Sequence, residues 1–240
     1  MRKHKAILFD LDDTLISFNG VAGQAWEICC AEFLRANAHG IPLDRLLNEI
    51  HTTRRWYWGD PARHKTGREN IEAARREVVR HALQVLGIAD EALVCALADH
   101  YSATQKRLMY RFPSTLAVLG ALVRNGYRLA LLTNGTSEGQ REKLARFALE
   151  PYFEHILIEQ EVGFGKPDLR IYEHARQLLG LRCEDLWMVG DNLVWDVRAP
   201  QSLGIFSVWY DAQQTGLPAE PDAVPDAEIR DLSELQTMLT

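Results

Sequence analysis

The stretch Ala6-Ile7-Leu8-Phe9-Asp10-Leu11-Asp12-Asp13-Thr14 consists of four apolar residues followed at once by a group of carboxylates. A short apolar run of this kind is typical of a strand that is buried on both faces, as in a parallel sheet. In open parallel sheets, ligands bind beyond the carboxyl ends of the strands. The stretch therefore predicts a central strand that ends in a chemically active loop.

Similar short apolar runs recur later in the chain and are predicted strands, namely 127–132, 155–158, 186–189, 205–208 and a short edge strand at 227–229. Between the later strands, the spacing of apolar residues predicts helices over 114–125, 138–147 and 169–179. The alternation of strand and helix implies an α/β fold, a Rossmann-like parallel sheet with helices on both faces.

Residues 18–111 break this rhythm, because they contain no convincing strand. Their apolar spacing instead predicts four helical stretches, at 21–36, 43–56, 69–86 and 90–110. We expect a catalytic core formed by 1–17 and 112–240, with 18–111 inserted as an all-helical cap domain.

Composition excludes several classes of protein. The chain has 27 basic and 33 acidic residues, a net charge of −6, whereas nucleic-acid binders usually carry a basic excess. The first apolar run, 6–9, is too short for a signal peptide, and no run approaches the roughly 18 residues of a membrane span. The four cysteines have no metal-ligand spacing and are expected to be reduced thiols. We expect a cytoplasmic protein without a nucleic-acid or membrane partner.

Four loops carry residues suited to phosphate chemistry, and three of them directly follow predicted strands. They are Asp10 to Thr14, Thr133-Asn134-Gly135, Gly165-Lys166-Pro167-Asp168, and Gly190-Asp191 with Asp196 five residues later. Each loop alone has an ordinary reading as a turn, a helix cap or a solvated lysine. Their occurrence together and in this order favours a single site at one edge of the sheet.

The chemistry of phosphate-ester hydrolysis explains this set of residues. A carboxylate nucleophile such as Asp10 divides the slow reaction into two easier steps. Asp12, two residues further along an extended backbone, points to the same side and can exchange a proton with the leaving oxygen and with water. Crowded carboxylates are hard to ionise together, and Mg²⁺, which prefers oxygen ligands, resolves this. Thr133 and Lys166 can contact the phosphoryl oxygens.

The four motifs together resemble those of the haloacid dehalogenase superfamily, most of whose members are phosphatases. The resemblance spans roughly residues 5–17 and 113–235, and the helical insert is similar to the alpha-helical cap of this family. The branch that looks closest contains phosphoglycolate-phosphatase-like and nucleotidase-like enzymes. The resemblance thus implies a magnesium-dependent phosphatase that acts on a small phosphorylated metabolite.

The resemblance also implies individual roles in catalysis. Asp10 would be the nucleophile and a metal ligand, and Asp12 the general acid and base that lends its backbone carbonyl to Mg²⁺. Thr14 would orient Asp12. The cap would close over the site, exclude water and determine the substrate.

For the phosphoryl group, the resemblance implies binding by Thr133 and by the backbone of Asn134, with Lys166 contacting both the phosphate and the nucleophile. Asp191 would bind Mg²⁺. Asp196 would lie in the outer metal shell or directly on the ion.

Several other functions are open at this stage. A 2-haloacid dehalogenase resembles this chain but lacks the second carboxylate that Asp12 supplies. A phosphonatase would need a cap lysine, and Lys65 lies in no recognisable motif. A phosphomutase shares the cap type and all four motifs. A catalytically idle binding module is disfavoured by the intact acidic residues.

The substrate itself is not identified by sequence, and phosphoglycolate, a nucleoside monophosphate or a sugar phosphate would all fit. Arg54, Arg55 and Arg63 lie in a basic-aromatic stretch of the predicted cap and are candidate specificity residues, although a solvated helix face explains them as well. The basic helix from Gln140 to Arg146 is interpreted as facing solvent. Monomer and homodimer are both open.

Overall fold

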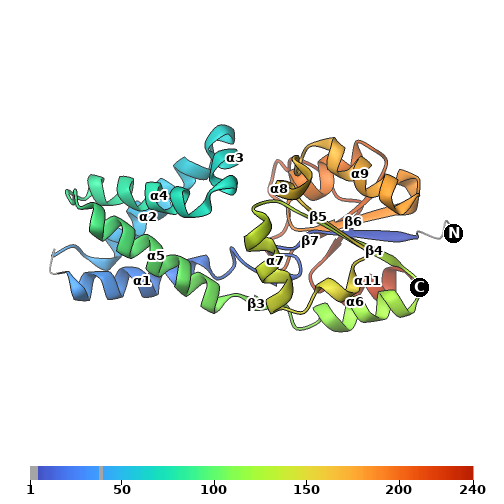
Figure 1. Ribbon diagram of the computed structural model, residues 1–240, viewed down its shortest axis with the longest axis horizontal. Coiled ribbons are helices and arrows are strands. Elements are labelled where there is room, and N and C mark those ends of the chain that lie inside the picture. The colour runs from blue at the N-terminus through green and yellow to red at the C-terminus, as the bar shows by residue number, and fades with distance from the viewer. Residues whose placement is uncertain (1–4, 38–39, 240) are drawn as a thin grey trace. The chain divides into compact units, whose positions relative to one another are not determined.

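Six parallel strands form the sheet of the computed structural model, which describes residues 5–37 and 40–239 (Figure 1). The strands are β1 (Ala6–Phe9), β4 (Arg128–Thr133), β5 (His155–Ile158), β6 (Leu186–Gly190), β7 (Phe206–Tyr210) and β8 (Ala227–Ile229). Their order across the sheet is β5-β4-β1-β6-β7-β8, so β1 lies between two partners and is completely buried. The predicted strands and their parallel arrangement are confirmed, with slightly shifted ends.

Helices cover both faces of this sheet, which confirms the predicted fold class. They are α6 (Thr115–Arg124), α7 (Ser137–Arg146), α8 (Glu159–Val162), α9 (Leu169–Leu179), α10 (Ala199–Gln201) and α11 (Glu234–Met238). Leu8 of β1 packs with Tyr172 and Ala175 of α9 in one hydrophobic cluster. α6 and α11 lie on the opposite face from α9 (Figure 1). Alternate residues of a strand point to opposite faces of the sheet. Because all four residues of β1 are apolar, they can pack against the helices on both faces.

The parallel register brings the loops that follow the strands to one edge. Phe9 pairs with Leu131 of β4 and with Val189 of β6, and the backbone N–H of Asp10 extends the ladder by donating to Val189 O over 3.0 Å. Short helical turns connect the remaining elements, namely the 3₁₀ turns η1 (Glu150–Tyr152) and η2 (Cys183–Asp185) and the π-helix η3 (Leu193–Arg198). The π-helix begins after the short loop Asp191-Asn192 that follows β6, and it was not predicted.

The chain divides into two units: a core unit, Met1–Ser17 with Tyr110–Thr240, and a helical unit, Phe18–Met109. The expected insert ended at residue 111, but Tyr110 and Arg111 belong to the core unit. They form β3 (Tyr110–Arg111), which pairs antiparallel with β2 (Ile16–Ser17). The sequence did not predict this pair of two-residue strands, because strands so short show no periodic alternation of apolar and polar residues.

The helical unit consists of α1 (Ala22–Ala36), α2 (Leu43–Trp58), α3 (Pro61–Glu69), α4 (Ile71–Val85) and α5 (Glu91–Leu108). Its core includes Trp26 stacked on Tyr101, with ring centroids 3.7 Å apart. α3 was not predicted, although its start carries a recognisable signal: Pro61 follows Asp60, whose side chain accepts from Arg63 N. The predicted helix 69–86 begins two residues later, where Asn70 caps α4.

All four cysteines are free, as expected, and Cys29 and Cys30 are buried in the helical unit. Among residues 5–37 and 40–239, no helix combines the length and the apolar character that crossing a bilayer requires.

Candidate active site

Asp10 lies immediately beyond β1 and is 7% exposed. Thr14 donates from Oγ1 to Asp10 Oδ2 over 3.2 Å. The expectation that Thr14 orients Asp12 is therefore wrong. The tight turn after β1, in which Leu15 N donates to Leu11 O, brings Thr14 back to the strand end and so to Asp10.

Lys166 lies between two carboxylates and is 2% exposed. Its Nζ donates to Asp10 Oδ1 and to Asp196 Oδ1, each over 2.6 Å. The Asn134 side chain fixes the lysine backbone from the neighbouring loop, because Asn134 Oδ1 accepts from Lys166 N at 2.8 Å and Nδ2 donates to Lys166 O at 2.6 Å. The amide of Asn134 thus holds the loop that carries Lys166.

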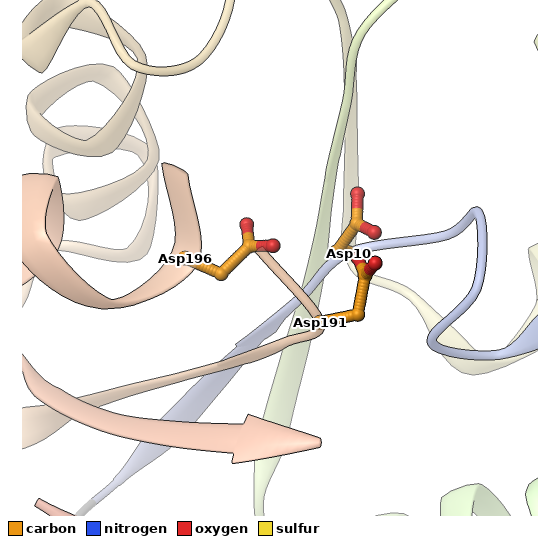
Figure 2. A group of neighbouring side chains, drawn as sticks. All are labelled: Asp10, Asp191 and Asp196. Carbon is orange, nitrogen blue, oxygen red and sulfur yellow. The ribbon is translucent and has the colours of Figure 1, made fainter. Parts of the chain in front are cut away.

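Asp191 and Asp196 complete an acidic cluster with Asp10, and ligand oxygens of the three carboxylates lie within 4.8 Å of one another. Figure 2 shows the three side chains converging from the end of β1, the end of β6 and η3. Asp196 is fully buried, and its Oδ2 accepts from Asn192 N at 3.1 Å. The side chain of Asn192 accepts from Val194 N and Trp195 N, which starts the π-helix that aims Asp196 at Lys166.

Burial and neighbouring charges shift the pKa values of Asp10, Asp191 and Lys166. Desolvation raises the pKa of Asp10 to about 7, against the opposing charge of Lys166 and with a further rise from Asp196. Desolvation, together with Asp10 and Asp196, also raises the pKa of Asp191 well above its usual range. Burial lowers the pKa of Lys166, but its two carboxylate partners outweigh this effect and the net pKa lies above the usual value.

The donor set of the cluster suits a hard divalent cation. Three carboxylates face one buried ammonium group, that of Lys166, so negative charge is in excess within the cluster. Mg²⁺ prefers oxygen ligands and would compensate this excess. All three carboxylates therefore supply candidate ligand atoms for such an ion.

Asp12 is held by two residues of α7 that the sequence analysis missed. Lys143 Nζ donates to Asp12 Oδ1 at 2.8 Å and to Oδ2 at 2.7 Å, and Gln140 Nε2 donates to Oδ2 at 3.1 Å. The interpretation of the helix 140–146 as facing solvent is wrong for these two positions. A usable signal was present, because residues three apart on a helix share a face and this helix follows the second motif directly.

Thr133 ends β4 and is 3% exposed. Its Oγ1 accepts a hydrogen bond from Gln140 Nε2, which also donates to Asn134 O at 2.9 Å. The structure therefore brings Thr133, Asn134 and Lys166 together at the same edge as Asp10.

The three candidate specificity arginines lie on α2 and α3 of the helical unit. The guanidinium of Arg63 lies 4.1 Å from the centre of the Trp56 ring and donates to Trp56 O at 2.7 Å. Arg55 is exposed and lies 3.5 Å from Thr52 Oγ1, while Arg54 is half-buried. Arg63 is therefore the most constrained of the three.

A parallel α/β sheet with a buried lysine and clustered carboxylates at its strand ends defines an α/β enzyme with a carboxylate-rich active site. The chain belongs to the haloacid dehalogenase-like hydrolase family, whose model matches residues 4–204.

Similar proteins include phosphatases. A phosphoserine phosphatase of Thermus thermophilus is 40% identical over 162 residues, which cover 67% of this chain and 63% of that protein. A glyceraldehyde 3-phosphate phosphatase of Methanothermobacter thermautotrophicus is 28% identical over 98% of this chain and 99% of its own length. The crystal structure of Bacillus subtilis YfnB, determined bound to magnesium, superposes with a TM-score of 0.74 at 21% identity and covers 99% of both chains. The last similarity concerns the fold alone.

Proposed function

We propose that the protein is a Mg²⁺-dependent phosphatase that hydrolyses a small phosphorylated metabolite through an aspartyl phosphate on Asp10. The observation that carries the proposal is the buried carboxylate of Asp10, which Lys166 holds beside Asp191 while a second carboxylate, Asp12, follows two residues later. The phosphatase names of the relatives from Thermus and Methanothermobacter support it.

In the first step, a carboxylate oxygen of Asp10 attacks phosphorus and the bond from phosphorus to the ester oxygen breaks. The departing oxygen takes a proton from Asp12 and leaves as an alcohol. Lys166, which donates to Asp10 Oδ1 at 2.6 Å, orients the nucleophile and offers positive charge to the phosphoryl oxygens.

In the second step, water attacks phosphorus and gives a proton to Asp12. The bond between phosphorus and Asp10 breaks, and inorganic phosphate leaves with the carboxylate restored. Thr133 Oγ1 and the backbone of Asn134, at the end of β4, hold the phosphoryl oxygens during both steps.

Magnesium bound by Asp10, Asp191 and the backbone carbonyl of Asp12 would neutralise phosphate charge and allow the nucleophile to approach an anion. Asp196 supports this arrangement by holding Lys166.

Asp12 also weighs against a 2-haloacid dehalogenase, since that branch lacks the second carboxylate. Turnover that requires a sugar bisphosphate would instead reveal a phosphomutase.

The decisive experiment measures Mg²⁺-dependent phosphate release from p-nitrophenyl phosphate by the unaltered protein and by Asp10→Asn. We expect Asp10→Asn to lower kcat by at least about 10³-fold, because loss of a nucleophile removes the covalent route. Glu184→Gln, a carboxylate neutralised on the surface turn η2, is the matched control and should keep full activity. Equal activity of Asp10→Asn and the unaltered protein would refute the proposal.

Substrate choice is proposed to depend on the helical unit. A phosphate-release panel of about a hundred metabolites, ranked by kcat/KM, would identify the substrate. Arg54→Ala, Arg55→Ala and Arg63→Ala should then lower kcat/KM selectively for substrates with a second anionic or ring-bearing part. Unchanged values across the panel would remove these arginines from the proposal.

A further inference from the structure

The carboxylate of Asp12 is fixed at both oxygens by residues of α7. Lys143 Nζ lies 2.8 Å from Oδ1 and 2.7 Å from Oδ2, and Gln140 Nε2 lies 3.1 Å from Oδ2. The side chains of Lys143 and Asp12 are only 13% and 23% exposed. A bidentate, part-buried contact of this kind restricts a short side chain far more than a surface ion pair does.

Gln140 connects this contact to the second motif. It is 3% exposed, and the two hydrogens of its Nε2 are shared among three acceptors within hydrogen-bond distance, namely Asp12 Oδ2, Thr133 Oγ1 and Asn134 O. The group that would exchange the proton and the group that would hold the phosphoryl oxygens therefore share one partner. Gln140 and Lys143 are three apart on α7, so they present one helix face to both.

We propose that Lys143 is a positioning residue for Asp12, and that Gln140 fixes the same carboxylate relative to Thr133. The inference rests on the proposed function, because it assigns Asp12 the transfer of a proton to the departing oxygen. Proton transfer needs the carboxyl group within hydrogen-bond reach of that oxygen, and a side chain released from Lys143 samples other rotamers. Lys143 thus acts through Asp12 and does not need to touch the substrate.

This role predicts that the loss depends on the leaving group. A nitrophenolate leaves readily without a proton, whereas an alkoxide does not. The value of kcat/KM depends only on the steps up to the departure of the alcohol. For an aryl phosphate, whose leaving group needs no proton, kcat/KM should therefore change little when Asp12 is misplaced. Water attack, the later step, still needs Asp12 as a base. For the aryl substrate, kcat and KM should therefore fall together.

The test compares Lys143→Met with Arg141→Met, which also removes one positive charge from α7 but breaks a surface contact with Glu161. The substrates are glycerol 1-phosphate and p-nitrophenyl phosphate, both with Mg²⁺. Lys143→Met should lower kcat/KM for glycerol 1-phosphate by at least about 10-fold, which is part of the roughly 10²–10⁴-fold that a general acid contributes. The loss for p-nitrophenyl phosphate should stay below about 3-fold. Lys143→Arg, which keeps the charge, should recover part of the loss, and Arg141→Met should change neither value.

Equal losses of kcat/KM on the two substrates would overturn the inference, because a merely structural defect does not distinguish leaving groups. An unchanged Lys143→Met enzyme would overturn it as well. Absence of hydrolysis by the unaltered protein would refute the proposed function itself and, with it, this inference. Hydrolysis by the unaltered protein together with equal losses would leave the proposed function intact.

Discussion

In the core unit, the ammonium group of Lys166 lies 2% exposed between the carboxylates of Asp10 and Asp196. In the helical unit, Arg76 and Arg80 pair with acidic residues of α5 while their own side chains stay 38% exposed. Buried ions lose hydration and depend on their partners, whereas exposed ions keep most of their hydration. The contrast indicates that the charges of the strand-end cluster depend on one another, whereas those on the helical surface depend mainly on water.

Arg75 is an intermediate case within the helical unit. Arg75 is half-buried, donates to Ser102 Oγ at 3.0 Å and lies 5.3 Å from the centre of the Tyr101 ring. Burial lowers the pKa of its guanidinium. The guanidinium contacts neutral side chains of α5, whereas Lys166 lies between two carboxylates.

The largest expected effect comes from removing the buried cation. Lys166→Met leaves Asp10 and Asp196 without their shared partner, and we expect a loss of about 3–5 kcal/mol in the free energy of unfolding. Urea unfolding in the presence of a chelator measures it. Arg80→Met, which breaks the surface pair with Glu91, should leave the urea midpoint unchanged. Equal shifts for the two variants would break the contrast between the units.

A glycine beside the cluster gives the next largest effect. A Cβ added at Gly190 would lie 2.3 Å from Asp196 Cγ, a distance at which the carboxylate must move. Gly190→Ala should cost about 1–3 kcal/mol, as overpacking does, and should reduce phosphate release.

A double-mutant cycle with Asp196→Gly tests the cause. When the side chain of residue 196 is already absent, Gly190→Ala should cost much less. Additive costs would show that the strain at Gly190 has another origin.

The affinity of the protein for Mg²⁺ should depend on pH, because carboxylates of the core unit would bind both the ion and protons. Because the pKa of Asp10 is raised to about 7, a proton occupies this carboxylate at lower pH and competes with Mg²⁺. From pH 8 to pH 6 the affinity for Mg²⁺ should therefore fall about 10-fold for this proton, and further if Asp191 also takes one up. Titration calorimetry with MgCl₂ measures both the affinity and the protons released. Arg80→Met should leave this profile unchanged, and an affinity independent of pH would contradict the assignment of Asp10 as a ligand.

Much of the core unit could be predicted because its signals are local. β1 is a four-residue apolar run that is buried throughout, and the Asp10 loop follows it without a break. Because parallel strands end at the same edge of a sheet, the sequence alone predicts that the motifs of Thr133 and Asp191 lie near Asp10.

The parts that were missed depend either on contacts between distant residues or on local geometry that apolar spacing does not report. Lys143 and Asp12 are 131 positions apart, and no local pattern states that the two meet. The partner of Thr14 was assigned wrongly because a tight turn decides it, and the helical period does not anticipate the π-helix that carries Asp196. Arg54, Arg55 and Arg63 remain predictions, because their role concerns a substrate that has not been identified.

The smallest expected effect lies in the helical unit and has the opposite sign. Gly23 lies near the start of α1, and a Cβ added there would have nothing within 4 Å. Gly23→Ala should stabilise the protein by about 0.4–1 kcal/mol, because alanine restricts the unfolded chain at a position whose helical backbone it can adopt. Gly87 offers a matched control, since it is equally open but has φ +80°. Gly87→Ala should destabilise by about 1–2 kcal/mol through backbone strain alone. If Gly23→Ala destabilised the protein as Gly190→Ala does, the open space around the new Cβ at Gly23 would not explain the difference between the two positions, and this account would be refuted.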